Sequence, residues 1–206
     1  ELVVGLIGYG YWGPNLLRTY SESGTARVKW VCDRDPQRQA RAKARYPSVM
    51  VTDSCANLCE DPEVDAVLVA TPISTHFALA KQALEHGKHV FVEKPLAASI
   101  DEARDMARAI ALAEPKFMVS QNYRWNDAVE TVRRAVAEGS IGEVGYITCA
   151  FHKAIRFGGW REQLPDVLLE DMSIHHFDLL RHITGRNCLR LYARSFRPHW
   201  SWFSGN

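Results

Sequence analysis

The chain has 206 residues, of which 47% are hydrophobic and 24% are charged. This length predicts one large domain, or one domain and part of a second, with enough apolar residues for a hydrophobic core. The 25 basic and 24 acidic residues leave a net charge of +1, which argues against nucleic acid or an anionic membrane surface as the partner. The sequence contains no apolar run long enough to cross a bilayer.

The five cysteines, at positions 32, 55, 59, 149 and 188, form no recognised metal-binding or disulfide pattern. An odd number of cysteines without such a pattern favours a reducing compartment. The chain opens with a buried type of strand and not with a charged segment before a signal core. We therefore expect a cytoplasmic protein.

The opening segment, residues 2–13, is an apolar run that leads into three glycines with G-x-G-x-x-G spacing. This pattern predicts a strand, a tight turn and a helix that together bind the pyrophosphate of a dinucleotide. Gly8 permits the turn, Gly10 leaves room for the pyrophosphate, and Gly13 lets the helix pack closely against the strand.

A second apolar strand, residues 28–32, ends at Asp33, about 20 residues beyond these glycines, where an acidic residue binds the ribose hydroxyls of NAD. The alternative is a capping role, because Asp33 and Asp35 precede Pro36 and a helical run. Arg34, with Arg38 and Arg41, leaves NADP open, since an arginine beside the ribose accepts a 2′-phosphate. The acidic Asp33 favours NAD.

Strands and helices alternate up to residue 121. The first predicted strand and helix lie on either side of the glycine turn that begins in residues 2–13. The other predicted strands are residues 28–32, 49–51, 64–70, 88–92 and 117–121, and the other predicted helices start at Asp53 or cover residues 36–45, 74–86 and 99–113. Ser99 and Glu102 form a capping box for the last of these helices. The alternation predicts an α/β fold with a doubly wound parallel sheet, whose ligands bind at the carboxyl ends of the strands.

The pattern changes after Asn122, so we expect a first domain over residues 1–122 and a partial second domain over residues 123–206. Helices are predicted at 128–138 and 167–184, and strands at 142–152 and 188–196. Two strands cannot bury an apolar face alone, and this indicates that the second domain is truncated.

Several segments together resemble the Gfo/Idh/MocA family of NAD(P)-dependent sugar and polyol oxidoreductases. The resemblance covers essentially the whole chain, and it is carried by Gly8–Gly13, Ala70–Pro72 with His76, Gly87–Val90, Glu93–Pro95 and Asp171–His175 with Asp178. It implies a Rossmann domain followed by an α+β domain with a largely antiparallel sheet for substrate binding and oligomerisation. It also implies that members of the family are longer than this chain and form homodimers or homotetramers through that sheet.

The resemblance places the chemistry on Lys94, His175 and Asp171. Lys94 matches the lysine near the nicotinamide and the substrate, and His175 matches the catalytic histidine. Asp171 lies one helical turn before His175, so an α-helix puts both on one face. Asp178 is close to that face, whereas His176 points elsewhere and is more typical of a packed residue.

The remaining site residues are also implied by the resemblance. Besides Lys94, the cofactor-binding residues are expected to be Gly8, Gly10, Tyr11, Trp12, Gly13, Asp33, Arg34, Thr71, Pro72, His76, Glu93, Asn122, Trp160 and Arg161. The expected substrate contacts are Lys94, Tyr123, Arg124, Asp171 and His175. Ser173 occupies a position where the family often has glycine, and this bears on substrate size.

These residues predict hydride transfer between nicotinamide and a secondary alcohol of a sugar, nucleotide-sugar or polyol. His175 is expected to exchange the hydroxyl proton, and Lys94 to stabilise the developing charge on oxygen. No metal is expected, since the His and Asp residues lack a closed ligand set. Two alternatives stay open: a redox-neutral NAD-dependent eliminase or glycosidase of the same fold, and a dinucleotide-sensing protein without turnover.

Overall fold

The computed structural model describes residues 1–153, 156 and 158–205, apart from the side chain of Trp160. The chain divides into two compact units, Glu1–Ser120 and Gln121–Asn206. Within the described residues, every helix is too short or too polar to cross a membrane.

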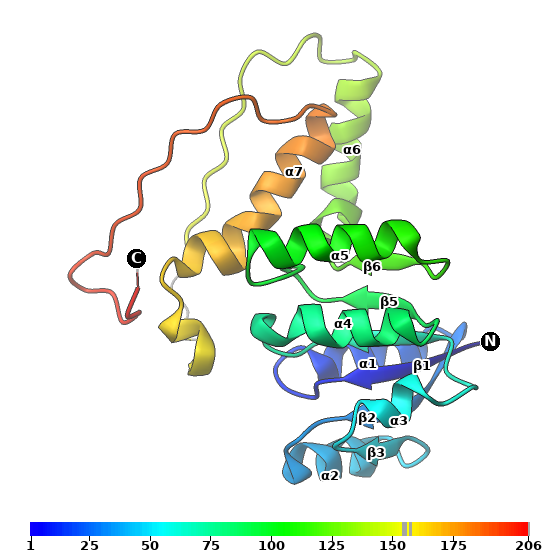
Figure 1. Cartoon of the computed structure of the whole chain (residues 1–206). Coiled ribbons are helices and arrows are strands. Elements are labelled where there is room, and N and C mark those ends of the chain that lie inside the picture. Colours follow the sequence, from blue (N-terminus) through cyan, green and yellow to red (C-terminus); the bar gives the residue numbers. More distant parts are fainter. Residues whose placement is uncertain (154–155, 157, 206) are drawn as a thin grey trace. The chain divides into compact units, whose positions relative to one another are not determined.

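The first unit is built on one parallel sheet of six strands (Figure 1). Its strands are β1 (Leu2–Ile7), β2 (Ala26–Cys32), β3 (Met50–Thr52), β4 (Ala66–Val69), β5 (His89–Val92) and β6 (Phe117–Val119). Their order is β3-β2-β1-β4-β5-β6, so the chain leaves β1 in one direction and returns to its other side with β4. This confirms the predicted doubly wound sheet and places the switch point between β1 and β4.

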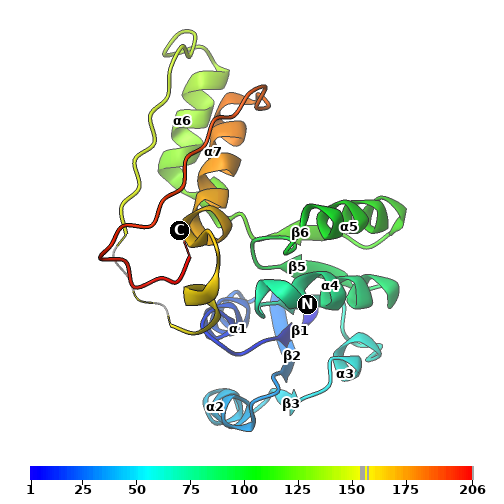
Figure 2. The same ribbon diagram turned by 60° about the vertical axis from the view of Figure 1, so that its left-hand side comes forward.

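Five helices cover the two faces of this sheet, as Figure 2 shows. One face packs on α1 (Gly13–Glu22) and α2 (Pro36–Arg45) through Leu16, Leu17 and Ala42. The other face packs on α3 (Ala56–Cys59), α4 (His76–Glu85) and α5 (Ile100–Leu112). Burial on both sides explains why the central strands are almost wholly apolar.

The helix starts follow the capping residues. Ser99 accepts a hydrogen bond from the Glu102 amide at 3.2 Å, while Glu102 accepts one from the Ala98 amide at 3.0 Å. Asp35 caps α2 by accepting a hydrogen bond from the Gln37 amide at 2.8 Å. The capping residue of this helix is therefore Asp35, and the capping alternative for Asp33 is wrong.

The second unit contains two helices that lie side by side, α6 (Asp127–Ala137) and α7 (Ile174–Thr184) (Figure 1). A short 3-10 helix, Asn122–Trp125, precedes α6, and another covers Gly159–Gln163. The predicted single helix over 167–184 is wrong in its first part, because Leu168–Ser173 forms a π-helical segment before α7 begins. Gly185 ends α7 in the left-handed conformation.

The segments 142–152 and 188–196, which the sequence predicts as strands, are irregular in this structure. Their alternating apolar side chains are left in solvent: Tyr146 is 87% exposed, Leu189 96% and Tyr192 90%. A strand forms only where a neighbour completes its hydrogen bonds, and no strand pairs with either segment in the described part of the chain. The expected antiparallel sheet is therefore not confirmed.

Candidate functional site

The glycine turn follows β1 at the switch point of the sheet. Gly8 has a φ of +97°, and a Cβ at this position would lie 2.6 Å from the carbonyl oxygen of Ala70, just after β4. The Gly8 amide donates a hydrogen bond to the Cys32 carbonyl at the end of β2, at 2.8 Å. The ends of both neighbouring strands thus hold the turn in place.

The other two glycines of the turn have different surroundings. A Cβ on Gly13 would overlap the carbonyl oxygen of Gly8, so the crowding comes from the turn itself more than from the strand behind it. A Cβ on Gly10 would approach only the Arg38 side chain, at 3.4 Å. The space beside Gly10 is therefore open, as a turn that cradles a pyrophosphate requires.

The Asp33 carboxylate lies against this turn and is 8% exposed. One oxygen accepts a hydrogen bond from the Tyr9 amide at 2.7 Å, and the other accepts one from the Asp35 amide at 2.9 Å. A carboxylate has about four acceptor positions, so capacity remains for ribose hydroxyls. Arg38, one of the three arginines that leave NADP open, has its Nη1 3.5 Å from the Asp33 carboxylate.

His76 connects two of the segments predicted to form the site. The imidazole is 1% exposed, with Nε2 at 2.8 Å from the carbonyl oxygen of Thr71 and Nδ1 at 2.7 Å from that of Pro95. Burial lowers the pKa of His76, and the charge on Lys94 acts in the same direction, whereas the two carbonyls raise it. A neutral imidazole donates from one nitrogen only, so it satisfies one of these carbonyls at a time.

Thr71 and Pro72 follow β4 beside the glycine turn. The Thr71 hydroxyl accepts a hydrogen bond from the Thr75 hydroxyl at 2.7 Å, and Pro72 begins the 3-10 turn Ile73–Thr75. This turn leads directly into α4 and sets the position of His76.

Glu93 and the half-buried Lys94 follow β5. Burial raises the pKa of Glu93, while hydrogen bonds from the side chains of Ser120 and Trp12 and the charge on Lys94 oppose this rise. Glu93 thereby links the glycine turn to the ends of β5 and β6. The sequence predicted Glu93 only as a cofactor-binding residue and missed its contact with Ser120, although a polar residue near the end of a predicted strand was a usable signal.

Tyr11 and Trp12 form the outer edge of the turn. They are 69% and 37% exposed, and their rings are 6.5 Å apart with planes inclined by 26°. Two adjacent exposed aromatic rings at the switch point provide an apolar surface for a flat ligand.

In the second unit, His175 is 4% exposed and lies against Tyr123. The two ring centres are 4.1 Å apart and their planes differ by 7°, a stacked arrangement. The neighbouring His176 instead contacts Phe151, with 4.9 Å between ring centres. The two adjacent histidines thus have separate surroundings, as the helical geometry predicted.

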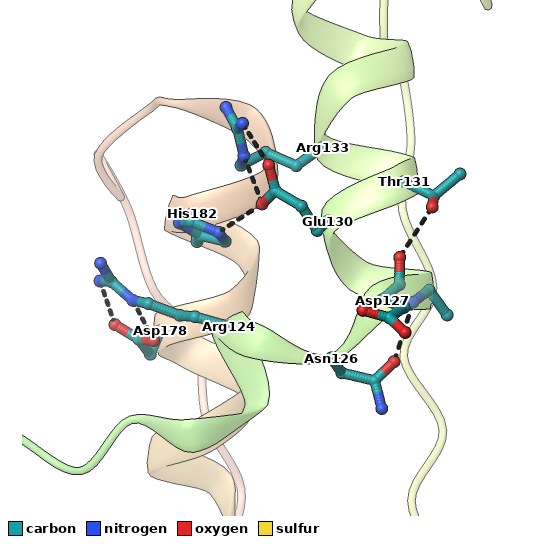
Figure 3. Close-up of polar contacts among 9 residues, drawn as sticks. Arg124, Asn126, Asp127, Glu130, Thr131, Arg133, Asp178 and His182 are labelled. Atoms are coloured by element: carbon teal, nitrogen blue, oxygen red, sulfur yellow. Dashed lines mark hydrogen bonds and ion pairs between the residues drawn. The ribbon is translucent and has the colours of Figure 1, made fainter. Parts of the chain in front are cut away.

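Arg124 and Asp178 fasten the 3-10 helix Asn122–Trp125 to α7 (Figure 3). Arg124 Nε donates to Asp178 Oδ2 at 2.7 Å, and Nη2 donates to the other carboxylate oxygen. The contact with Asp178 raises the pKa of Arg124. This two-point contact fixes the backbone that carries Tyr123, whereas the neighbouring Asn122 is exposed.

Asp171 lies in the π-helical segment, is 4% exposed and forms an ion pair with Arg161 at 3.3 Å. Arg161 was expected to contact the cofactor, and its neighbour Trp160 has its side chain outside the described groups. The α-helical spacing assumed for Asp171 and His175 does not apply across the π-helical segment.

A polar network joins α6 to α7 away from these residues, as Figure 3 also shows. Arg133 donates to Glu130 at 2.8 Å and lowers the pKa of Glu130 to about 2, and His182 Nε2 lies 3.6 Å from the same carboxylate. Asn126 caps α6 by accepting a hydrogen bond from the Ala128 amide at 3.0 Å.

The structure therefore brings the predicted residues together in separate groups. In the first unit the glycine turn, Asp33, Thr71, His76 and Glu93 surround the carboxyl ends of β1, β2, β4 and β5. In the second unit Tyr123 joins His175, Arg124 joins Asp178, and Arg161 joins Asp171.

Comparison with known proteins gives matches along most of the chain. D-Apiose dehydrogenase of Rhizobium rhizogenes is 29% identical over 200 residues, which cover 96% of this chain and 58% of that protein. Inositol 2-dehydrogenase 1 of Saccharopolyspora erythraea is 32% identical over 200 residues, which cover 94% of this chain and 58% of that protein. The chain thus spans little more than half the length of these relatives.

Among solved structures, an oxidoreductase from Agrobacterium radiobacter in complex with NAD+, L-tartaric acid and magnesium superposes with a TM-score of 0.78. It is 28% identical, and the match covers 90% of this chain and 55% of that one.

Two family models account for most of the sequence. Residues 2–121 match the oxidoreductase family with an NAD-binding Rossmann fold, and residues 129–201 match the GFO/IDH/MocA C-terminal domain. The chain belongs to the GFO/IDH/MocA oxidoreductase family.

Proposed function

We propose that the protein is an NAD-dependent dehydrogenase that oxidises a secondary alcohol of a sugar, a nucleotide-sugar or a polyol, or catalyses the reverse reduction. The observation that carries this proposal is the Asp33 carboxylate held against an open glycine turn by the Tyr9 amide. The relatives named D-apiose dehydrogenase and inositol 2-dehydrogenase support a sugar or polyol as the substrate class.

The residues of the first unit fit a dinucleotide. The open space beside Gly10 suits the pyrophosphate, which the amides at the start of α1 attract. Asp33 accepts hydrogen bonds from the ribose hydroxyls, and its negative charge opposes a 2′-phosphate. NAD is therefore favoured. If NADP binds instead, Arg38 is the residue that would pair with its 2′-phosphate.

The bound nicotinamide supplies the hydride acceptor in oxidation and the hydride donor in reduction. In oxidation, His175 acts as the general base and takes the proton of the reacting hydroxyl. The Lys94 ammonium donates a hydrogen bond to the same oxygen and stabilises its developing negative charge. Asp171 binds a substrate hydroxyl or orients His175, and in reduction His175 returns the proton.

We also propose that residues 142–152 and 188–196 become strands of a largely antiparallel sheet when further strands complete it. Their alternating apolar residues support this proposal. Such a sheet would form the surface of a homodimer or homotetramer. The unpatterned cysteines support a cytoplasmic location.

The first experiment is calorimetric titration of the chain with NAD and with NADP, using Asp33→Ala and the matched neighbour Asp35→Ser. We expect Asp33→Ala to weaken NAD binding at least about tenfold, because it removes a charged hydrogen-bond acceptor that is worth roughly 1.5–3 kcal/mol. Asp35→Ser preserves the helix cap and leaves binding nearly unchanged. Failure of the unmodified chain to bind either dinucleotide contradicts the proposal.

The second experiment is a panel of sugars and polyols assayed for NADH absorbance with a full-length version of the protein, unmodified and with Lys94→Ala or His175→Ala. Loss of the general base is expected to lower kcat by about 10²–10⁴. Dinucleotide binding with product formation but no net NADH points to the redox-neutral enzyme. Dinucleotide binding without any turnover points to a sensor.

A further inference from the structure

Two cysteines from different segments meet beside the glycine turn. Cys32 is the last residue of β2, and Cys55 precedes α3 in the connection that follows β3. Their Sγ atoms are 3.7 Å apart, within hydrogen-bonding distance for two thiols. Cys32 is 2% exposed, whereas Cys55 is only partly buried and faces the same core cluster.

The two thiols differ in acidity. The hydrogen bond with Cys32 lowers the pKa of Cys55 to about 7 and is a larger effect than burial, which raises it; the charge on Arg34 adds a smaller lowering. The same hydrogen bond and burial raise the pKa of Cys32. Cys55 is therefore the nucleophile of the pair near neutral pH, and Cys32 is the proton donor.

We propose that Cys55 is a site of oxidation by hydroperoxides and that Cys32 is its resolving thiol, so that the pair is converted into an intramolecular disulfide. The proposal rests on the 3.7 Å approach of two sulfurs with unequal exposure. It does not depend on the proposed dehydrogenase activity.

The chemistry balances with hydrogen peroxide as the oxidant. The Cys55 thiolate attacks one peroxide oxygen, so an S–O bond forms, the O–O bond breaks, and hydroxide leaves and takes up a proton from solvent. The Cys32 sulfur then attacks the Cys55 sulfenic acid, the S–S bond forms, and the S–O bond breaks with release of water. The two sulfurs lose two electrons, which reduce the peroxide to water.

Geometry requires only a local movement. A disulfide bond is about 2.05 Å long, so the sulfurs must approach by roughly 1.6 Å. Rotation of the two side chains and a shift of the short connection before α3 provide this movement, because Cys55 lies outside the sheet.

The crosslink would act on the dinucleotide site through two backbone contacts. The Cys32 carbonyl accepts the hydrogen bond from the Gly8 amide at 2.8 Å, and the following amide, of Asp33, donates to the Thr52 carbonyl at 3.0 Å. A disulfide that pulls Cys32 toward Cys55 displaces the strand end that positions both Gly8 and Asp33. The expected loss of dinucleotide affinity is the one part of this inference that rests on the proposed function.

The test is peptide mass spectrometry of the full chain, reduced and then treated with equimolar hydrogen peroxide at neutral pH before alkylation. We expect a Cys32–Cys55 crosslinked peptide that is about 2 Da lighter than the sum of its two reduced peptides. A dithiol reductant should convert it back to these two peptides. Cys32→Ala should stop at a Cys55 sulfenic acid that dimedone traps, and Cys55→Ser should leave Cys32 reduced. Cys188→Ser, which changes an exposed cysteine in the other unit, should form the crosslink as the unmodified chain does.

A second measurement needs no variant. The rate of iodoacetamide labelling of Cys55 followed against pH should have its midpoint near 7, below the value of about 8.5 for an ordinary cysteine thiol. Oxidation confined to Cys149 and Cys188, or a labelling midpoint for Cys55 at or above about 8.5, overturns the proposal. A crosslink that forms without changing NAD affinity overturns only the coupling to the dinucleotide site.

Discussion

The phenol ring of Tyr123 lies flat on the imidazole of His175, with 4.1 Å between ring centres and 7° between planes. This contact covers one face of a buried histidine with an aromatic ring that is itself 36% exposed. The imidazole therefore has a fixed plane, which a proton donor or acceptor needs if it is to meet one hydroxyl group in a set direction.

Replacing Tyr123 tests this stack. Tyr123→Leu is expected to destabilise the second unit by about 1 kcal/mol, since an aromatic pair contributes roughly 0.5–1.5 kcal/mol beyond its buried area. Tyr123→Phe preserves the ring and should cost less than about 0.5 kcal/mol. Urea denaturation measures both changes. The ring-proton resonances of His175 should move in the leucine variant alone; equal resonances in all three proteins would show that the rings are not stacked in solution.

The pair formed by Arg124 and Asp178 is expected to contribute more to the free energy of unfolding than the ion pairs on the helix surfaces do. Asp178 is 12% exposed at its side chain and Arg124 is 37% exposed. Asp178→Asn should therefore cost about 1–2 kcal/mol, at the low end for hydrogen bonds to charged groups because solvent screens the arginine. The control is Asp105→Asn, whose partner Arg108 is 75% exposed. That change should stay within about 0.5 kcal/mol, and equal losses from both variants in a denaturation series would contradict the expectation.

His76 should make the stability of the first unit depend on pH. Burial lowers its pKa below the ordinary value of 6.5, so just below that pH the unfolded chain binds a proton that the folded chain does not. The contribution of His76 to stability is complete above pH 6.5 and falls as the pH drops, by at most about 1.4 kcal/mol per pH unit. His76→Gln retains one amide donor for the Thr71 or Pro95 carbonyl but cannot titrate.

The measurement for His76 is the free energy of unfolding between about pH 5 and 7.5 for the unmodified chain and for His76→Gln. The difference between the two curves should shrink as the solution becomes more acidic. Parallel curves would mean that His76 titrates alike in the folded and unfolded chains. A difference that grows toward low pH would mean that the folded protein favours the protonated imidazole.

Gly13→Ala should destabilise the first unit even though alanine favours helices. The added Cβ overlaps the carbonyl oxygen of Gly8, which is backbone and cannot rotate away. The cost of overpacking, about 1–3 kcal/mol, exceeds the gain of at most about 1 kcal/mol in helix propensity. The matched control is Gly145→Ala, where no atom lies within 4 Å of the new Cβ. A thermal melt that places Gly13→Ala at or above the unmodified chain would refute this account of the turn.

The sheet of the first unit could be predicted because its signals are local. Each strand is an apolar run that ends at a turn or capping residue, and Asp35 and Ser99 fix the starts of their helices through neighbouring amides. The glycine spacing further predicted the tight turn after β1, which the structure contains at Gly8. Local sequence is sufficient where a strand is buried on both faces.

The contacts of the second unit could not be predicted in the same way. Arg124 and Asp178 are 54 positions apart, and no local pattern pairs them. The strands expected at 142–152 and 188–196 depend on neighbours that the described residues do not provide, so an alternating pattern was insufficient. A π-helix differs from an α-helix only in which carbonyl each amide reaches, and the side chains of Leu168–Ser173 give no sign of that choice.

The π-helical segment has a consequence for how the length of this region can change in evolution. A π-helical turn holds one residue more than an α-helical turn, so deletion of a single residue within Leu168–Ser173 would convert it to α-helix without breaking the chain direction. If the deleted residue is Met172 or Ser173, the part of the π-helical segment that precedes it, with Asp171, would then rotate by about 100° around the axis relative to α7. Asp171 would leave the position where it meets Arg161, while Tyr123 and His175 would keep theirs. One codon in this stretch therefore separates two different orientations of a buried carboxylate.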